Sequence, residues 1–177
     1  FTGAFETEPV FAKDSESIYV VQGNGDRVDI WQVTKGDKKK FWWQNRTFVF
    51  EKVTDDPVTE ENMKLSPDGR YLAYTKARGD LWVLALKEKD AEPRLLFKGH
   101  QSPQYNFSPQ GDWIVTTRFD DDYNGDIWIV ATDGSESPVN VSRHPDLEAY
   151  PVWSPDGKMI AFTGTRHDDE RDVYYLW

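Results

Sequence analysis

The sequence contains no cysteine, which excludes disulfide bonds, thiolate metal sites and a cysteine nucleophile. It also lacks any run of about 18 apolar residues, so no segment is expected to span a membrane as a helix. Basic residues are outnumbered, because 21 Lys and Arg stand against 31 Asp and Glu, a formal net charge of −10. Proteins that bind nucleic acid or anionic lipid need a basic surface, and this charge therefore argues against both kinds of partner.

Helical periodicity is hard to find anywhere in the chain. Aromatic residues, by contrast, are abundant: Phe, Trp and Tyr make up 15% of the sequence, and eight residues are Trp. Side chains of this size usually supply packing between layers of structure. The 177 residues are enough for one domain with a hydrophobic core.

A short phrase recurs along the chain. "LSPDGRYLAY" occupies residues 65–74, "WSPDGKMIAF" residues 153–162, and a looser copy, "FSPQGDWIVT", residues 107–116. The apolar residues that precede the turns are Phe11, Leu65, Phe107 and Trp153. Their spacing of about 42 to 54 residues is typical of the blades of a β-propeller.

Each repeat is expected to form antiparallel strands. In Ser-Pro-Asp-Gly, Pro fixes φ for the second position of a type I turn, Ser and Asp bond back to the local backbone, and Gly accepts positive φ. A strand is expected after each turn, at 17–21, 71–75, 113–117 and 159–163. A third strand that begins Asp-apolar-aromatic is expected at 29–33, 80–84, 126–130 and 172–176, and a fourth at 50–54, 93–97 and 138–142.

These strands predict an all-β fold, a β-propeller of four-stranded antiparallel blades with about four blades present. The predicted blades cover approximately residues 4–56, 57–99, 100–144 and 145–177, of which the last is incomplete. Residues 1–3 resemble the tail of a fourth strand from an earlier blade, and "DVYYLW" is a third strand with no fourth after it. We therefore expect part of a six- or seven-bladed ring, and a closed four-bladed ring is the alternative.

The stretch "EAYPVWSPDGKMIAFTGTRHDDERDVYYL", residues 148–176, resembles the WD-like propeller repeat of the tricorn protease family and of the periplasmic TolB propeller. The resemblance covers nearly all of the chain. It implies a non-catalytic propeller for substrate recognition or gating in a larger tricorn-like serine peptidase, whose protease domain would lie C-terminal to it.

Two other functions are compatible with the same repeat, because one repeat serves many roles. One is a TolB-like periplasmic propeller that binds other proteins, and the other is the propeller of a prolyl-oligopeptidase-type enzyme. The expected partners are a peptide or protein, the remaining blades and a C-terminal catalytic domain of the same polypeptide. The resemblance implies a periplasmic or secreted bacterial protein, although the residues do not exclude the cytoplasm. The chain begins with neither an initiating Met nor a signal peptide, and we expect targeting information to lie outside it.

No catalytic residue is predicted within the chain, and no cofactor is expected. The serines of the repeated turns recur for structural reasons, and none lies in a Gly-x-Ser-x-Gly motif. The three histidines fall in loop-like stretches, and no pattern pairs them with a nucleophile. The serines are Ser66, Ser108 and Ser154, and the histidines are His100, His144 and His167.

Two acidic patterns have features of metal sites, and neither predicts one. "DDDYNGD", residues 120–126, matches the first half of a calcium loop, but the twelfth position is Ala131 and the flanks are predicted strands. The second pattern is a recurring Asp at the start of each third strand. A carboxylate there is expected to accept N–H bonds from the neighbouring turn and hold the blade together. These residues are Asp29, Asp80, Asp126 and Asp172.

An insertion in the first repeat carries the candidate binding residues. Residues 34–52 contain six Lys or Arg and two acids, and Phe41, Trp42 and Trp43 stand side by side near Arg46. One interpretation is a longer hairpin whose aromatics pack on the next blade. The other is a contact surface for a peptide or protein, since Trp and Arg are common at binding hot spots. If the segment is a strand, at least one of the three aromatics points away from the blade. Single-stranded nucleic acid suits the same composition, but the net charge argues against it.

Overall fold

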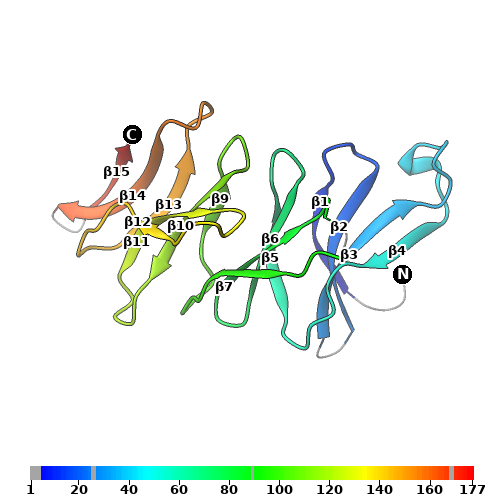
Figure 1. The fold of residues 1–177 in the computed structure, drawn as a ribbon, viewed down its shortest axis with the longest axis horizontal. Coiled ribbons are helices and arrows are strands. Elements are labelled where there is room, and N and C mark those ends of the chain that lie inside the picture. The colour runs from blue at the N-terminus through cyan, green and yellow to red at the C-terminus, as the bar shows by residue number, and fades with distance from the viewer. Residues whose placement is uncertain (1–4, 25–26, 89, 168–169) are drawn as a thin grey trace.

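A computed structural model describes residues 5–24, 27–88, 90–167 and 170–177 of the chain. The described residues form an all-β fold of four antiparallel sheets, in which consecutive strands are neighbours (Figure 1). The chain is therefore built as the repeat predicts. The predicted tail of an earlier blade at residues 1–3 lies outside the described residues.

The strands follow the repeats of the sequence. The first sheet contains β1 (Phe5–Phe11), β2 (Ser17–Asn24), β3 (Arg27–Lys35) and β4 (Phe48–Lys52). The second contains β5 (Glu60–Leu65), β6 (Tyr71–Lys76), β7 (Asp80–Ala85) and β8 (Arg94–Phe97). The third contains β9 (Tyr105–Phe107), β10 (Trp113–Phe119), β11 (Gly125–Ala131) and β12 (Val139–Asn140), and the fourth contains β13 (Glu148–Trp153), β14 (Ile160–His167) and β15 (Glu170–Leu176). The predicted blade limits fall in the connections between sheets and stay a prediction.

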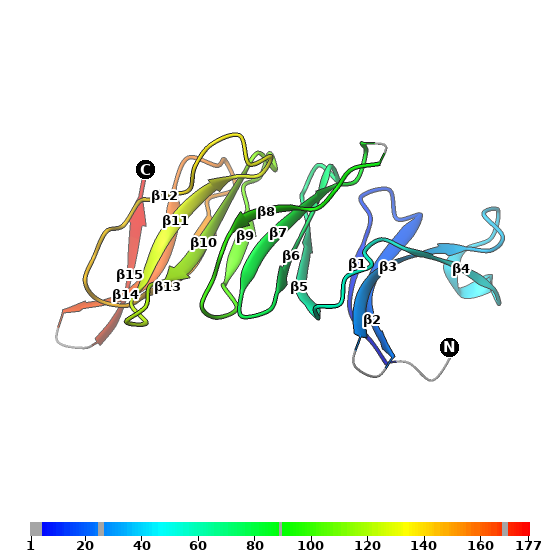
Figure 2. The same cartoon turned by 60° about the horizontal axis from the view of Figure 1, so that its bottom comes forward.

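The four sheets lie in a row, with the first and the last at opposite ends (Figures 1 and 2). They do not close on one another, so the described chain is a partial propeller and not the four-bladed ring that was the alternative. No helix among the described residues is long and apolar enough to cross a membrane.

The repeated turn closes each first hairpin in the same way. In the second sheet Ser66 N donates to Tyr71 O at 2.9 Å, Gly69 N donates to Ser66 O at 2.8 Å, and Gly69 has φ 70°. The first sheet lacks the motif but forms the same turn, because Ala12 N donates to Ser17 O at 2.9 Å and Ser15 takes the glycine position with φ 60°. The turn geometry therefore comes from the hairpin as a whole and survives the loss of three of the four motif residues.

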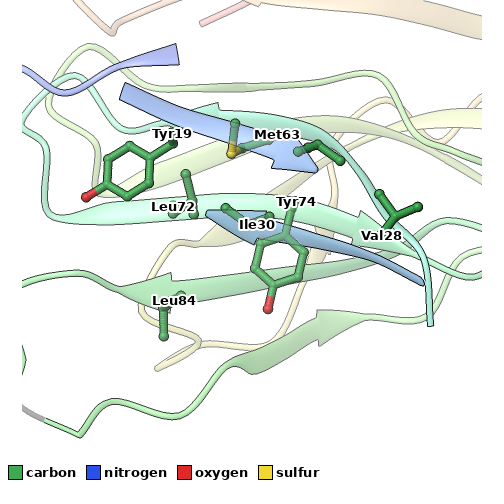
Figure 3. Close-up of a cluster of buried hydrophobic side chains, with 8 residues drawn as sticks. Tyr19, Val28, Ile30, Met63, Leu72, Tyr74 and Leu84 are labelled. Carbon is green, nitrogen blue, oxygen red and sulfur yellow. The ribbon is translucent and has the colours of Figure 1, made fainter. Parts of the chain in front are cut away.

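Apolar side chains fill the spaces between neighbouring sheets. Between the first two sheets, Tyr19, Ile30, Leu72 and Tyr74 form part of one buried cluster (Figure 3). Similar clusters join the second sheet to the third and the third to the fourth. Burying one such large side chain is worth about 1.5–3 kcal/mol. The apolar character of both faces in the second and third sheets is thus explained, because each of these sheets packs between two others.

Candidate functional site

The recurring Asp of the third strand ties each sheet to the connection that follows it. Asp29 Oδ1 accepts a hydrogen bond from the backbone N of Asp56 at 3.2 Å, and Asp80 Oδ1 accepts one from Gly99 N at 3.0 Å. Asp126 Oδ1 accepts one from the backbone N of His144 at 3.1 Å. The prediction of a structural carboxylate is confirmed at these three positions.

The acidic segment that resembles half of a calcium loop forms a hairpin turn. Asp120 Oδ1 accepts hydrogen bonds from the backbone N atoms of Asp122 and Asn124, both at 2.9 Å. Within the described ranges, no group of three or more Asp, Glu or His side chains is arranged to hold a metal ion.

The serines of the repeated turns are engaged in building those turns. Ser66 Oγ donates to Asp68 Oδ1 at 2.7 Å and accepts from Tyr71 N at 2.9 Å. Ser154 makes the same bonds, to Asp156 Oδ1 at 2.6 Å and from Met159 N at 2.9 Å.

The histidines lie in other parts of the fold. His100 Nε2 lies 3.1 Å from Asp121 Oδ1, and His144 Nδ1 accepts from Asp146 N at 3.2 Å. His167 is exposed at the end of β14. None of the hydrogen bonds of the described residues joins a histidine to a serine of the turns.

The first strands of successive sheets line a hollow of about 400 Å³, which we call the inner-edge hollow. Strands β5, β9 and β13 each end the strand order of their sheet, so each has one edge without a neighbour in its own sheet. In a closed propeller the blades surround a central channel. The hollow is lined by Asn62, Lys64, Ser102, Pro103, Gln104, Tyr105, Asn106, Tyr150, Pro151 and Val152.

A β-bulge interrupts the first strand of three of the four sheets. The pairing of β1, β5 and β13 with the next strand shifts at residues 7–10, 61–64 and 149–152. Each bulge holds one non-glycine residue at positive φ, namely Glu8 at 52°, Asn62 at 54° and Tyr150 at 59°. Bulges re-aim side chains and are common next to functional sites, and non-glycine residues at positive φ are uncommon. These residues stand three positions before the apolar residue of the repeated turn, where the third repeat has Gln104.

The re-aimed side chains connect one first strand to the next. Glu8 Oε2 accepts from Met63 N at 2.9 Å, and Asn62 Nδ2 donates to Pro103 O at 3.0 Å. Gln104 Oε1 accepts from the backbone N of Tyr150 at 3.0 Å. The ring of Tyr150 is left 53% exposed beside the hollow. Side chains at this position therefore link successive sheets by hydrogen bonds, and at Tyr150 the aromatic ring is presented to solvent.

A partly buried lysine and a fully buried tyrosine line the hollow where β5 faces β9. Lys64 Nζ donates to the Tyr105 carbonyl and, at 3.0 Å, to Asn106 Oδ1, and burial lowers the pKa of this amine. Tyr105 is fully buried, its hydroxyl donates to the carbonyls of Asn62 and Ala73, and burial raises its pKa. The hollow thus combines fixed amide groups with one partly buried cation and an exposed ring.

The predicted binding residues lie on the loop between β3 and β4, away from the hollow. The segment is not a strand, because Trp42–Gln44 forms a 3₁₀ turn, η1. Trp42 packs on its own sheet, where its ring meets those of Phe11 and Phe48 and its Nε1 donates to Ser15 O at 2.9 Å. Packing of the aromatics on the next blade is therefore not what the structure shows.

The other predicted binding residues point away from the sheet. Phe41 and Trp43 stack on each other with ring centroids 4.6 Å apart and planes 2° apart, and they are 61% and 79% exposed. Arg46 is also exposed. The structure thus brings Phe41 and Trp43 together and assigns Trp42 to an anchoring position.

Sequence reasoning identified the loop but missed the inner-edge hollow. The available signal was a polar or aromatic residue that recurs three positions before the apolar residue of each repeated turn. These residues are Glu8, Asn62, Gln104 and Tyr150. It is weak, because the residue type differs in every repeat and only the position is shared.

Comparison with known proteins supports the propeller assignment. No protein-family model matches the chain. Over 122 residues, which are 67% of this chain and 11% of the relative, it is 25% identical to a tricorn protease homolog from Saccharolobus solfataricus. The crystal structure of TolB from Acinetobacter baumannii matches 98% of this chain and 41% of its own, with a TM-score of 0.64 and 17% identity. The crystal structure of the tricorn protease matches 86% of this chain and 14% of its own, with a TM-score of 0.69 and 11% identity.

The chain spans less than half of each of these proteins, so the likeness concerns the propeller and not their whole activity. The order of the strands, the repeated turns and these similarities agree with one another. The chain has a β-propeller fold similar to the propellers of TolB and the tricorn protease, with four sheets that do not close into a ring.

Proposed function

We propose that the chain is a non-catalytic part of a propeller that recognises or gates peptide substrates for a larger tricorn-like serine peptidase. The inner-edge hollow carries the proposal, because amide side chains (Asn62, Gln104 and Asn106) and the exposed Tyr150 ring line it. Such groups match the alternating polar and apolar character of an extended peptide. The similarity to a tricorn protease homolog supplies the peptidase context.

Peptide binding at the hollow is testable on the 177-residue chain. Labelled unstructured peptides of mixed sequence would be titrated while fluorescence anisotropy is recorded. Tyr150→Asn is expected to weaken binding about fivefold, because it removes the ring, worth about 1 kcal/mol, and Asn tolerates positive φ. Tyr175→Asn is the matched control, since Tyr175 is an exposed tyrosine on β15. Equal affinities for the two variants would contradict a binding role for the hollow.

The peptidase context has a separate test in the polypeptide that carries these residues. A serine protease domain in the same polypeptide is expected, and Tyr150→Asn there should raise KM for long peptides without changing kcat for a short chromogenic substrate. An α/β-hydrolase domain would instead indicate a prolyl-oligopeptidase-type enzyme.

A TolB-like interaction propeller is the second candidate, and the structural match over 98% of the chain favours it. On this proposal the hollow and the sheet faces bind partner proteins, and the protein resides in the periplasm or is secreted. A polypeptide without any hydrolase domain, recovered from the periplasmic fraction, would support this candidate. Recovery from the cytoplasm with a protease domain would support the first.

A further inference from the structure

The loop of residues 36–47, between β3 and β4, forms a second surface that the proposed function does not use. It lies at the end of the row beyond the first sheet (Figures 1 and 2), whereas the hollow is lined by residues of β5, β9 and β13 and the segments beside them. The solvent-exposed stack of Phe41 and Trp43 is unusual, because large apolar side chains normally bury each other against a core. We call this pair and the adjoining basic residues the rim platform.

The platform is held in a fixed conformation by hydrogen bonds within the loop. Gln44 Oε1 accepts from Phe41 N at 3.1 Å, and Gln44 N donates to Phe41 O at 3.0 Å. Asn45 joins the two sides of the loop, since its Oδ1 accepts from Asp37 N at 2.9 Å and its Nδ2 donates to Phe41 O at 3.0 Å. Trp42 fastens the loop to the first sheet. A surface that is ordered before binding loses little conformational entropy when a partner arrives.

The charge of the loop is opposite to that of the chain. Lys38, Lys39, Lys40 and Arg46 are exposed, and Asp37 is the one acid between residues 36 and 47. Asp37 pairs with Lys40 at 3.4 Å, and Lys38, Lys39 and Arg46 form no ion pair with a described residue. Three uncompensated cations beside two stacked rings favour an anionic partner that also carries a flat apolar group.

We propose that the rim platform binds an acidic peptide segment with an aromatic side chain, supplied by another polypeptide. The aromatic side chain packs on the outer face of Trp43, and carboxylates on either side of it pair with Lys38, Lys39 and Arg46. Trp42 takes no part in the contact, because its ring and its Nε1 are already engaged with the first sheet.

The test uses the 177-residue chain and a fluorescein-labelled peptide with one phenylalanine between two pairs of aspartates. Fluorescence anisotropy would compare it with the same peptide carrying alanine and with one carrying lysines in place of the aspartates. Both replacements are expected to weaken binding about fivefold or more, the factor that corresponds to about 1 kcal/mol. Binding of the acidic peptide should weaken as salt is raised from about 50 to 300 mM, because screening reduces the charge attraction.

Two variants of the platform have matched controls elsewhere on the surface. Trp43→Ser is expected to weaken binding of the phenylalanine peptide about fivefold, whereas Trp177→Ser, at an 89% exposed tryptophan, should not. Lys38→Glu with Lys39→Glu should remove the salt dependence, whereas Lys158→Glu, at an exposed lysine, should keep it. Unchanged unfolding midpoints in urea would show that these variants remain folded.

Several outcomes would overturn the proposal. One is equal affinity for the phenylalanine and alanine peptides, and another is tighter binding of a single-stranded oligothymidylate than of the acidic peptide. A third is concentration-dependent self-association in sedimentation equilibrium that Trp43→Ser abolishes, because the occupant would then be a second copy of the chain. Tyr150→Asn should leave binding of this probe unchanged, so failure here and failure of peptide recognition at the hollow are distinguishable.

Discussion

The ion pair between Glu148 on β13 and Arg166 on β14 is the contact whose removal should most affect the fourth sheet. Glu148 is fully buried, and its Oε1 accepts from Arg166 Nε at 2.8 Å and from Nη2 of the same guanidinium. Glu148 Oε2 is buried and has no hydrogen-bond partner among the described residues. The guanidinium also lies over the Tyr174 ring, 4.6 Å from its centroid. Arg166 is therefore the group that compensates this buried charge.

We expect Arg166→Met to lower the free energy of unfolding by about 3 kcal/mol, the cost of leaving a buried carboxylate without its partner. The Coulomb attraction across 2.8 Å is about 6 kcal/mol at an effective dielectric constant of about 20. The cost of desolvating the arginine offsets part of this attraction. The lost contact between the cation and Tyr174 adds about 1 kcal/mol, part of which the methionine sulfur restores. For a chain of this length, 3 kcal/mol corresponds to a fall in Tm of about 6 to 12 °C.

The measurement is urea unfolding followed by circular dichroism at pH 7, with Arg78→Met as the control because Arg78 is exposed in the turn between β6 and β7. The control should change the free energy of unfolding by less than about 0.5 kcal/mol. Adding Glu148→Gln to Arg166→Met should recover at least about 1 kcal/mol, since the uncompensated charge is then gone. A loss below about 1 kcal/mol for Arg166→Met, or no recovery in the double variant, would refute the reasoning.

Three further substitutions test other parts of the fold. Gly157 ends the fourth repeated turn with φ 72°. Gly157→Val should therefore lower the free energy of unfolding by about 1 kcal/mol or more, whereas Lys158→Ala should change it little. Equal urea midpoints for the two variants would show that the turn is misassigned. Burial alone would raise the pKa of Asp68, but hydrogen bonds from Ser66 and Arg70 lower it to about 2. The stability that ionised Asp68 contributes is therefore complete above its ordinary pKa of 3.8 and is lost as the pH falls through about 2. Asp68→Asn should accordingly lower the free energy of unfolding by about 1–2 kcal/mol at pH 7 and hardly at all at pH 2. A difference that does not vary with pH would contradict this. Trp42→Ala should lower the free energy of unfolding by about 2 kcal/mol and Trp43→Ala should hardly change it, because only Trp42 is packed on the first sheet. Similar melting temperatures for the two variants would contradict the anchoring position of Trp42.

The order of the strands could be predicted because the signals that specify it are local. Each Ser-Pro-Asp-Gly turn fixes its own hairpin, and the Asp that opens a third strand meets backbone N–H groups only 18 to 27 residues ahead, as Asp126 and Asp29 show. The first repeat demonstrates the limit of the motif. Ser15 adopts positive φ in place of glycine, because pairing of β1 with β2 requires a tight turn there whatever its sequence.

The candidate surfaces could not be predicted in the same way, because they depend on contacts that no local pattern encodes. The bond from Asn62 to the Pro103 carbonyl joins two sheets, and it exists only because a bulge turns the amide towards the neighbouring strand. In the loop after β3, the strand-like run of aromatics becomes a 3₁₀ turn because Gln44 and Asn45 satisfy the backbone of Phe41. The two polar side chains that follow the aromatics thus decide that Trp42 is packed and that Phe41 and Trp43 are exposed.

The bulge position also explains how one scaffold presents different chemistry at its inner edge. At the same place in successive repeats, Glu8 accepts a hydrogen bond, Asn62 donates one, Gln104 accepts one and Tyr150 leaves its ring in solvent. The hydrophobic clusters pack between the sheets and do not include these four residues, so the residue at this position is set by its contact with the next strand. If the hollow binds peptides as proposed, variation at this position changes recognition without changing the fold, in keeping with the many roles that one repeat serves.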